Sequence, residues 1–194
     1  GCAFAREAVW RGVHRARGER RVGVSMGWRA ASGGYYSACA ADRILADPST
    51  LTGSIGVYAG KVSLGGLYQK LGVDTLRLQR GDNAGLYGYS EAWTPSEFKA
   101  IERVVDHLYA DFIEHVREGR GIDDIAEVDR VAQGRVWTGA QALDAGLVDE
   151  LGGLMDAIEV ARELAGIPDR AEVQLRPMPR VGLIPSLQIG KGFV

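Results

Sequence analysis

The sequence predicts one α/β domain, and three observations support this fold class. The chain has 194 residues, 46% of them hydrophobic, which is enough for one well-packed core and short for two domains. Residues 21–36 combine an apolar, β-favouring run, a turn of small residues and the start of a helix. Strand-like runs alternate with segments of helical apolar spacing along the rest of the chain, as in α/β proteins.

The first half of the chain contains most of the expected strands. It opens with an amphipathic segment whose arginines lie on the solvated side, and we interpret its histidine, His14, as a surface residue. The expected elements are a helix over 2–19, a strand over 22–26, a helix over 35–41, strands over 43–46 and 51–58, a helix over 64–71 that ends at Gly72, and a strand over 73–79.

The second half of the chain is mainly helical. Residues 80–93 are rich in glycine and aromatic residues and show neither the helical nor the strand period of apolar residues. This pattern predicts a functional or interface loop. A long helix over 95–117 follows, with Thr94 or Ser96 as its N-cap and with His107 and His115 two turns apart. The remaining expectations are a helix over 122–133, an extended piece over 135–137, a helical turn over 139–145, a helix over 155–165, a strand over 171–176 and a tail over 177–194 that docks on a neighbour or is disordered.

Composition argues against several classes of partner. The 23 basic and 25 acidic residues form no block of like charge, so nothing predicts binding to nucleic acid or to an anionic membrane. Cys2 and Cys39 lack metal-ligand or C-x-x-C spacing, and we expect no metal or cofactor and a buried Cys39. The chain starts without methionine and has no apolar run of about 18 residues, so we expect a piece of a longer protein without its own membrane anchor.

Ser32 is the candidate nucleophile. It precedes a predicted helix, whose first N–H groups are unpaired and carry partial positive charge, so a serine there lies beside donors that can hold an oxyanion. Gly33 and Gly34 would let a substrate carbonyl approach the backbone closely. The alternative is that Ser32 is only an N-cap, and spacing alone favours it, because S-G-G is a weaker signal than a G-x-S-x-G elbow.

Three motifs carry a resemblance to a known family. The runs SMGWRAASGGYY, ADRILADPSTLTGSIGV and GRVWTGAQALDAGLVDELGG, in this order, resemble the signal peptide peptidase A (protease IV) family of serine proteases over about residues 1–166. The resemblance implies the Clp protease/crotonase α/β fold, with parallel strands and flanking helices, here lacking its first strands. It also implies a protease IV-like domain over 1–168, followed by a carboxy-terminal strand and extended tail over 169–194.

The resemblance assigns roles to individual residues. Ser32 becomes the nucleophile, and the N–H of Gly33 stabilises the oxyanion, with Gly1 as a possible second donor because it matches the second glycine of a P-G-G turn. Ser54 would hydrogen-bond a lysine general base and orient it, although a strand serine bonded to backbone explains that position equally well. Asp149 matches a recurring family aspartate, which we interpret as structural.

The lysine general base is missing from its expected position, which Ala84 occupies. The four lysines are Lys61, Lys70, Lys99 and Lys191, and none lies in the 80–93 loop. Arginine cannot replace lysine, because its pKa above 12 keeps it protonated. The chain therefore resembles the carboxy-terminal half of a tandem family member whose other half carries the lysine. Two alternatives are Lys61 acting as the base and a lysine lost from a non-catalytic unit.

The leading hypothesis is a serine endopeptidase that degrades cleaved signal peptides and other short apolar peptides, with its base supplied by another half or subunit. Its expected partners are peptide substrates and either identical subunits or a lysine-bearing amino-terminal half. By resemblance alone it would act at the cytoplasmic membrane, with its catalytic part outside the cytoplasm. The alternatives are a non-catalytic scaffold or peptide-binding unit and, less favoured, a crotonase-like enzyme acting on acyl-CoA thioesters.

Overall fold

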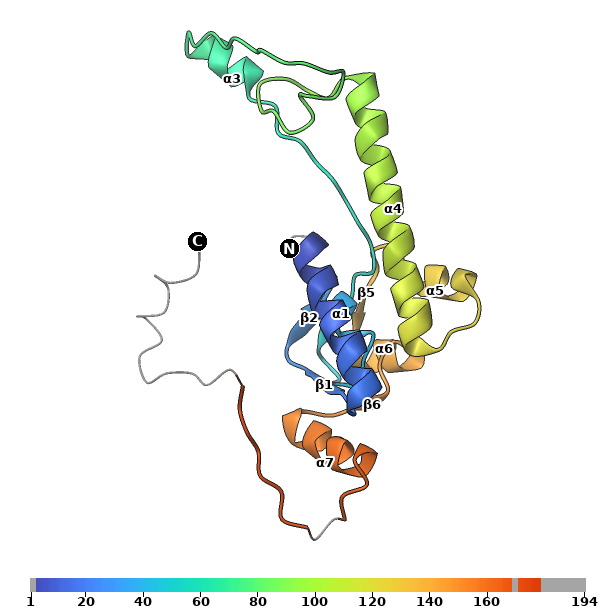
Figure 1. The fold of residues 1–194 in the computed structure, drawn as a ribbon. Helices are drawn as coiled ribbons and strands as arrows, with labels where there is room; N and C mark the ends of the chain where they lie inside the picture. The colour runs from blue at the N-terminus through green and yellow to red at the C-terminus, as the bar shows by residue number, and fades with distance from the viewer. Residues whose placement is uncertain (1–2, 169–170, 179–194) are drawn as a thin grey trace, which may run out of the picture.

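The computed structural model describes residues 3–168 and 171–178 (Figure 1). The elements, in chain order, are α1 (Ala3–Glu19), β1 (Gly23–Met26), β2 (Arg29–Ala31), α2 (Gly33–Ala38), β3 (Arg43–Ala46), β4 (Leu51–Gly53), α3 (Gly65–Lys70), α4 (Pro95–Arg120), α5 (Ile125–Val131), β5 (Val136–Thr138), α6 (Gly139–Asp144), β6 (Glu150–Leu151) and α7 (Leu154–Leu164).

Two small sheets form the centre of the fold. In the first sheet the strand order is β1-β3-β6 and all pairs are parallel. In the second the order is β2-β4-β5, with β2 and β4 parallel and β5 antiparallel to β4. Parallel strands need a crossover connection, and helix α2 lies in the crossovers from β1 to β3 and from β2 to β4. It packs against both α1 and β2.

The main core lies around α2. The largest side chains there are fully buried, and the hydroxyl of Tyr35 donates a hydrogen bond to the carbonyl of Leu147 at 2.9 Å. Phe112 and Val116 bring α4 onto this core, and Cys39 is fully buried, as predicted. We call the elements packed here the body, which comprises residues 3–57 and 94–168.

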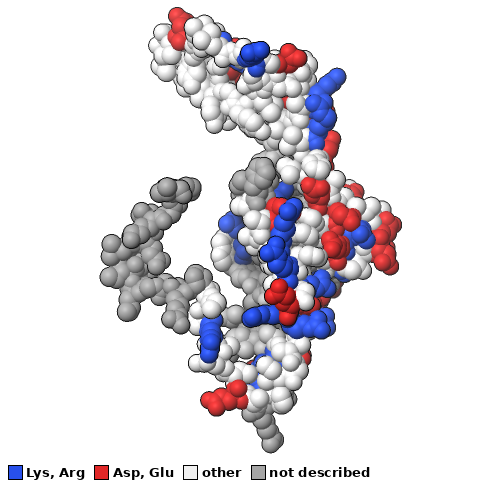
Figure 2. Space-filling model, viewed as in Figure 1, with Lys and Arg blue, Asp and Glu red and all other residues white. Residues whose placement is uncertain are grey.

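Residues 58–93 form a projecting lobe at the far end of α4 (Figure 1). The helix in this lobe, α3, has no buried residue. Several large apolar side chains of the lobe are exposed, among them Leu71, Leu76, Leu78 and Tyr87. On the face drawn in Figure 2, the lobe is largely uncharged, whereas charged side chains cover much of the body. The lobe therefore presents an apolar surface that the rest of the described chain leaves uncovered.

Four element predictions need correction. The turn expected around residues 29–31 is strand β2, because it pairs with β4. The strand expected over 51–58 ends at Gly53, since Gly53 and Ser54 both have positive φ, which breaks the strand. Residues 73–79 form no strand, because no ladder partner lies beside them among the described residues. The described part of 171–178 also contains no strand.

Other expectations agree with the structure. Strand β3 spans the predicted residues, α3 ends before Gly72 at φ 69°, and α4 starts after Thr94, which forms a capping box with Glu97. The helix expected over 122–133 is shorter, as α5. Most of the carboxy-terminal strand-and-tail segment over 169–194 lies outside the described residues.

Candidate functional site

Ser32 lies between β2 and α2 in a strained conformation. Its φ of 51° and ψ of −111° are unusual for a residue with a Cβ, and its N–H donates to the carbonyl of Gly53 at 2.8 Å. Ser32 occupies the N-cap position of α2, but its side chain makes no capping hydrogen bond. The alternative in which the Ser32 hydroxyl caps the helix is therefore wrong, because that hydroxyl makes no hydrogen bond to the start of α2.

The register of the second sheet brings Ser32 and Ser54 together. Ala31 pairs with Gly53 at the carboxyl ends of two parallel strands, so the next residue of each strand is a serine. The N–H of Ser54, at φ 49°, donates to the carbonyl of Arg135 at 2.7 Å. Gly53 is required here because of its positive φ and because a Cβ would lie 2.7 Å from the Trp137 ring.

A third strained residue, Gln133, lies beside the two serines. Its φ is 55°, and the non-glycine residues with positive φ among those described are Ser32, Ser54 and Gln133. The N–H of Gln133 donates to the hydroxyl of Tyr109 at 3.2 Å, and this hydroxyl donates to Asp129 at 2.5 Å. Burial and the hydrogen bond to Asp129 raise the pKa of Tyr109, so this phenol stays protonated and is a donor. Strain of this kind concentrates at functional sites.

All three strained residues line one cavity of about 940 Å³, which we call the Ser32 cavity. Its apolar wall comes from Val57, Val105 and Leu108, and its charged lining residues are Arg6 and Asp106. The remaining lining residues are Ser32, Ser54, Gly56, Tyr58, Tyr109, Gln133 and Gly134. The arrangement suits an extended, mostly apolar ligand that passes over a serine hydroxyl.

Gly33 opens the first turn of α2, next to the nucleophile candidate. The first N–H groups of a helix have no partner within the helix, so the N–H of Gly33 is available to an oxyanion. Nothing lies within 4 Å of a Cβ added to Gly33, so the space there is open to a substrate. Gly1, the possible second donor, lies outside the described residues.

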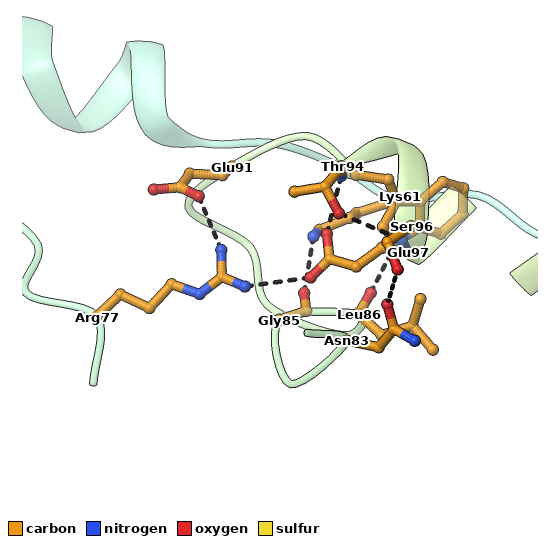
Figure 3. Close-up of polar contacts among 10 residues, drawn as sticks. Lys61, Arg77, Asn83, Gly85, Leu86, Glu91, Thr94, Ser96 and Glu97 are labelled. Atoms are coloured by element: carbon orange, nitrogen blue, oxygen red, sulfur yellow. Dashed lines mark hydrogen bonds and ion pairs between the residues drawn. The ribbon is translucent and has the colours of Figure 1, made fainter. Parts of the chain in front are cut away.

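No amine among the described residues lines the Ser32 cavity. Lys61 lies in the lobe, where its Nζ donates to the carbonyl of Gly85 at 2.8 Å close to Glu97 (Figure 3). Because β4 ends at Gly53, Lys61 is not part of that strand, and it does not line the cavity as a base for Ser32 would. Ala84 is exposed in the lobe and does not line the cavity, and Lys70 and Lys99 are exposed.

The histidines also lie elsewhere. His14 is exposed and stacks on Trp10, while His107 is exposed beside Asp111. His115 stacks on Trp10 with ring centroids 3.7 Å apart. Within residues 3–168 and 171–178, no group of three or more His, Cys, Asp or Glu side chains is arranged to hold a metal ion.

Asp149 connects elements of the body, away from the Ser32 cavity. It accepts a hydrogen bond from the N–H of Ile44 at 2.7 Å and pairs with Arg120 at 2.5 Å. These contacts attach the segment before β6 to β3 and α4, which fits the structural role expected for Asp149.

The comparisons with known proteins identify the family. The model of peptidase family S49 matches residues 14–168. The chain belongs to peptidase family S49. For this S49 chain, the predicted α/β fold with parallel strands and flanking helices is confirmed.

Three relatives illustrate the similarity within family S49. The chain is 38% identical over 194 residues to the chloroplastic serine protease SPPA of Arabidopsis thaliana, covering 99% of this chain and 28% of that protein. It is 34% identical over 175 residues to protease 4 of Haemophilus influenzae, covering 90% and 28%. It is 34% identical over 147 residues to a protein named as signal peptide peptidase SppA in Enterococcus faecium, covering 76% and 42%. The chain thus spans less than half the length of these relatives.

Sequence reasoning found the two serines of this S49 chain but missed three other residues of the cavity. No motif singled out these three residues, which are Arg6 in α1, Tyr109 in α4 and Gln133 just after α5. The one available signal was the A-Q-G-R run before β5, where a glycine follows a polar residue at the end of a helix. In the described part of the chain, no helix combines the length and hydropathy needed to cross a membrane.

Proposed function

We propose that this chain carries the nucleophile of a serine endopeptidase that degrades cleaved signal peptides and other short apolar peptides. The single observation that carries the proposal is the strained Ser32, whose side chain caps no helix and which lines the cavity together with Ser54. Membership of peptidase family S49 and relatives named as serine protease and signal peptide peptidase support it. The apolar wall of the cavity suits apolar peptides.

The proposed reaction is acyl transfer. Ser32 Oγ adds to the scissile carbonyl as a base takes its proton, and the N–H of Gly33 holds the resulting oxyanion. Loss of one such donor costs about 3 kcal/mol of transition-state stabilisation in other serine peptidases. The proton then passes to the leaving amine, and the acyl-enzyme is hydrolysed by water that the same base activates.

The base is proposed to be a lysine from another half or subunit. A neutral amine can accept the serine proton only when burial or nearby positive charge lowers its pKa. The described residues place no amine in the cavity. Ser54, which follows the strand paired with that of Ser32, would hold the incoming amine by a hydrogen bond.

We propose that a lysine-bearing unit of the same fold covers the exposed apolar surface of the lobe. The lobe is largely uncharged on one face and exposes Leu76 and Leu78 almost fully, at 85% and 88%. The matched relatives extend well beyond the aligned region, which leaves length for a second unit. By resemblance to the family, the assembly would act at the cytoplasmic membrane with its catalytic part outside the cytoplasm.

The runner-up function is a non-catalytic scaffold or peptide-binding unit. The cavity without an amine is the observation that favours it, because a serine without a base is a weak nucleophile. Such a unit would still bind apolar peptides and would do so equally well after Ser32→Ala.

Labelling with a serine-directed phosphonate separates the two functions. We expect the full-length protein to be labelled at Ser32 and this chain alone to be labelled much more slowly, because only the former has the proposed base. Ser32→Ala should remove labelling and turnover, whereas the control Ser63→Ala, which changes a lobe serine, should preserve both. Equal labelling of the chain alone and the full-length protein would refute the borrowed base, and no labelling or turnover in either would favour the scaffold.

A further inference from the structure

Arg6 is the one positively charged residue that lines the Ser32 cavity among the described residues. It lies in α1, with its guanidinium carbon 4.7 Å from the ring centroid of Tyr36 and 5.6 Å from that of Phe112. Within the described part of the chain, Arg6 makes no hydrogen bond and no ion pair. By contrast, Arg11, in the same helix, pairs with Glu7 at 2.6 Å.

The nearest carboxylate to Arg6 in sequence is occupied by other partners. Glu7 accepts hydrogen bonds from the hydroxyl of Tyr36 at 2.5 Å and from Arg11 at 2.6 Å, and it lies 3.3 Å from His115. These contacts fix the Tyr36 ring over which Arg6 stacks. They leave the guanidinium held by cation–π contacts, which restrict its motion while its N–H groups stay unused.

A guanidinium without an anion beside an apolar cavity is a ready receptor for a carboxylate. Its planar fork of N–H donors matches a carboxylate in a bidentate pair, and such charged pairs are stronger than neutral hydrogen bonds. The other charged residue lining the cavity is Asp106, which repels an anion, so an incoming carboxylate is directed to Arg6.

We propose that Arg6 forms a carboxylate-binding subsite that holds the free C-terminal carboxylate of a peptide fragment in the Ser32 cavity. This inference rests on the proposed function, because it gives that function a substrate class. Short apolar fragments contain few charges, and a preceding cleavage always leaves a free α-carboxylate at the new end. The subsite would therefore favour the products of an earlier endoproteolytic step over internal segments of intact chains.

Matched peptides test the subsite. One short apolar sequence is prepared as a C-terminal acid, as a C-terminal amide and as an amide with one aspartate near its end, and each is titrated against the full-length protein carrying Ser32→Ala. We expect the acid to bind about tenfold more tightly than the amide, as for one charge-assisted contact. Arg6→Gln should reduce this ratio to about one, and Arg6→Lys should restore part of it, because lysine keeps the charge without the fork.

The control is Arg15→Gln, which removes the same charge from an exposed position of α1 that has no ion-pair partner among the described residues. It should leave the acid-to-amide ratio unchanged, and a ratio lowered equally by both substitutions would overturn the subsite in favour of general charge attraction. A ratio of one in the Ser32→Ala protein with native Arg6 would also overturn it. Tight binding of the aspartate amide would support carboxylate recognition but place its source on a side chain.

Turnover by the protein with native Ser32 separates this inference from the proposed function. Tighter binding of the acid together with no hydrolysis would refute the peptidase proposal and support the subsite. Hydrolysis of acid and amide at equal rates, with equal affinities, would support the peptidase proposal and refute the subsite.

Discussion

The body and the lobe of this molecule differ in how far their large apolar side chains are buried. In the body, Tyr35, Ile44 and Phe112 are fully buried, whereas in the lobe Leu76 and Leu78 are exposed at 85% and 88%. In the body, the buried hydroxyl of Tyr35 donates to the Leu147 carbonyl. In the lobe, polar contacts are prominent. Lys61 contacts Gly85 within the lobe, and Arg77 joins the lobe to Glu97 at the start of α4 (Figure 3). The difference is the reason for the proposal that another unit covers the lobe.

The sharpest test of this contrast is a methyl group added to one glycine in each region. A Cβ at Gly139 would overlap the carbonyl oxygen of Asp47, so Gly139→Ala should destabilise the body by about 3 kcal/mol. A Cβ at Gly66, in α3, meets nothing within 4 Å, and alanine favours a helix more than glycine does, so Gly66→Ala should cause no loss of stability. Urea unfolding measures both, and similar losses would contradict the contrast.

The next test adds charge to the apolar surface of the lobe. Leu76→Glu combined with Leu78→Glu should dissociate the proposed assembly and lower turnover by about 100-fold, because carboxylates are expensive to bury in an interface. Analytical ultracentrifugation and peptide hydrolysis by the full-length protein measure the effect. The control is Gln69→Glu with Gln79→Glu, which adds the same charge at exposed polar positions. An unchanged sedimentation coefficient together with unchanged turnover for the leucine variant would exclude this surface as an interface.

A smaller effect on stability is expected when the pH is lowered, through the carboxylate of Glu7 in the body. Burial tends to raise the pKa of Glu7, but hydrogen bonds from Tyr36, Arg11 and His115 outweigh it and lower that pKa from 4.5 to about 2. Because the folded pKa lies below the unfolded one, Glu7 stabilises the fold above pH 4.5, and this contribution disappears as the pH falls towards 2. After allowance for solvent screening, Glu7→Gln should cost about 1 kcal/mol at pH 7.

Unfolding in urea at pH 7 and pH 3 checks this sign. The Glu7→Gln protein should lose less stability than the wild type between the two values, because it lacks the titrating group. Glu19→Gln is the control, since Glu19 is exposed near the end of the same helix and has no partner among the described residues. Equal losses of stability in the wild type and the Glu7→Gln protein would show that Glu7 does not cause the pH dependence.

The smallest effect is expected at the base of the lobe. Arg77 pairs with Glu91 at 2.7 Å and with the buried Glu97 at 3.1 Å, and the N–H of Thr94 also donates to Glu97. Arg77→Ala should therefore speed amide exchange over residues 85–93 by about threefold, as for loss of a partly exposed ion pair, and leave the body unchanged. Hydrogen exchange measures this, with Arg80→Ala as the control. Faster exchange throughout the body as well would show that the two regions are coupled.

Local signals in the sequence predicted the elements whose stability is local. Strand β3 and helix α4 were foreseen because an apolar run and a Thr94–Glu97 capping box require no knowledge of distant residues. Strand β2 was missed, since three residues without an apolar period become a strand only by pairing with β4. Residues 73–79 gave the opposite error, because their alternation is strand-like but no partner lies beside them among the described residues.

The candidate site divides in the same way. The strand-turn-helix pattern singled out Ser32 and Gly33, and the resemblance carried by the motifs added Ser54 and pointed to the family to which the chain belongs. Only the tertiary structure decided that the two serines are neighbours, through the pairing of Ala31 with Gly53. It also brought Arg6 to them from a different helix. The physical reason is that a motif records local backbone and side-chain chemistry, whereas a cavity depends on strand register and helix packing between residues far apart in the chain.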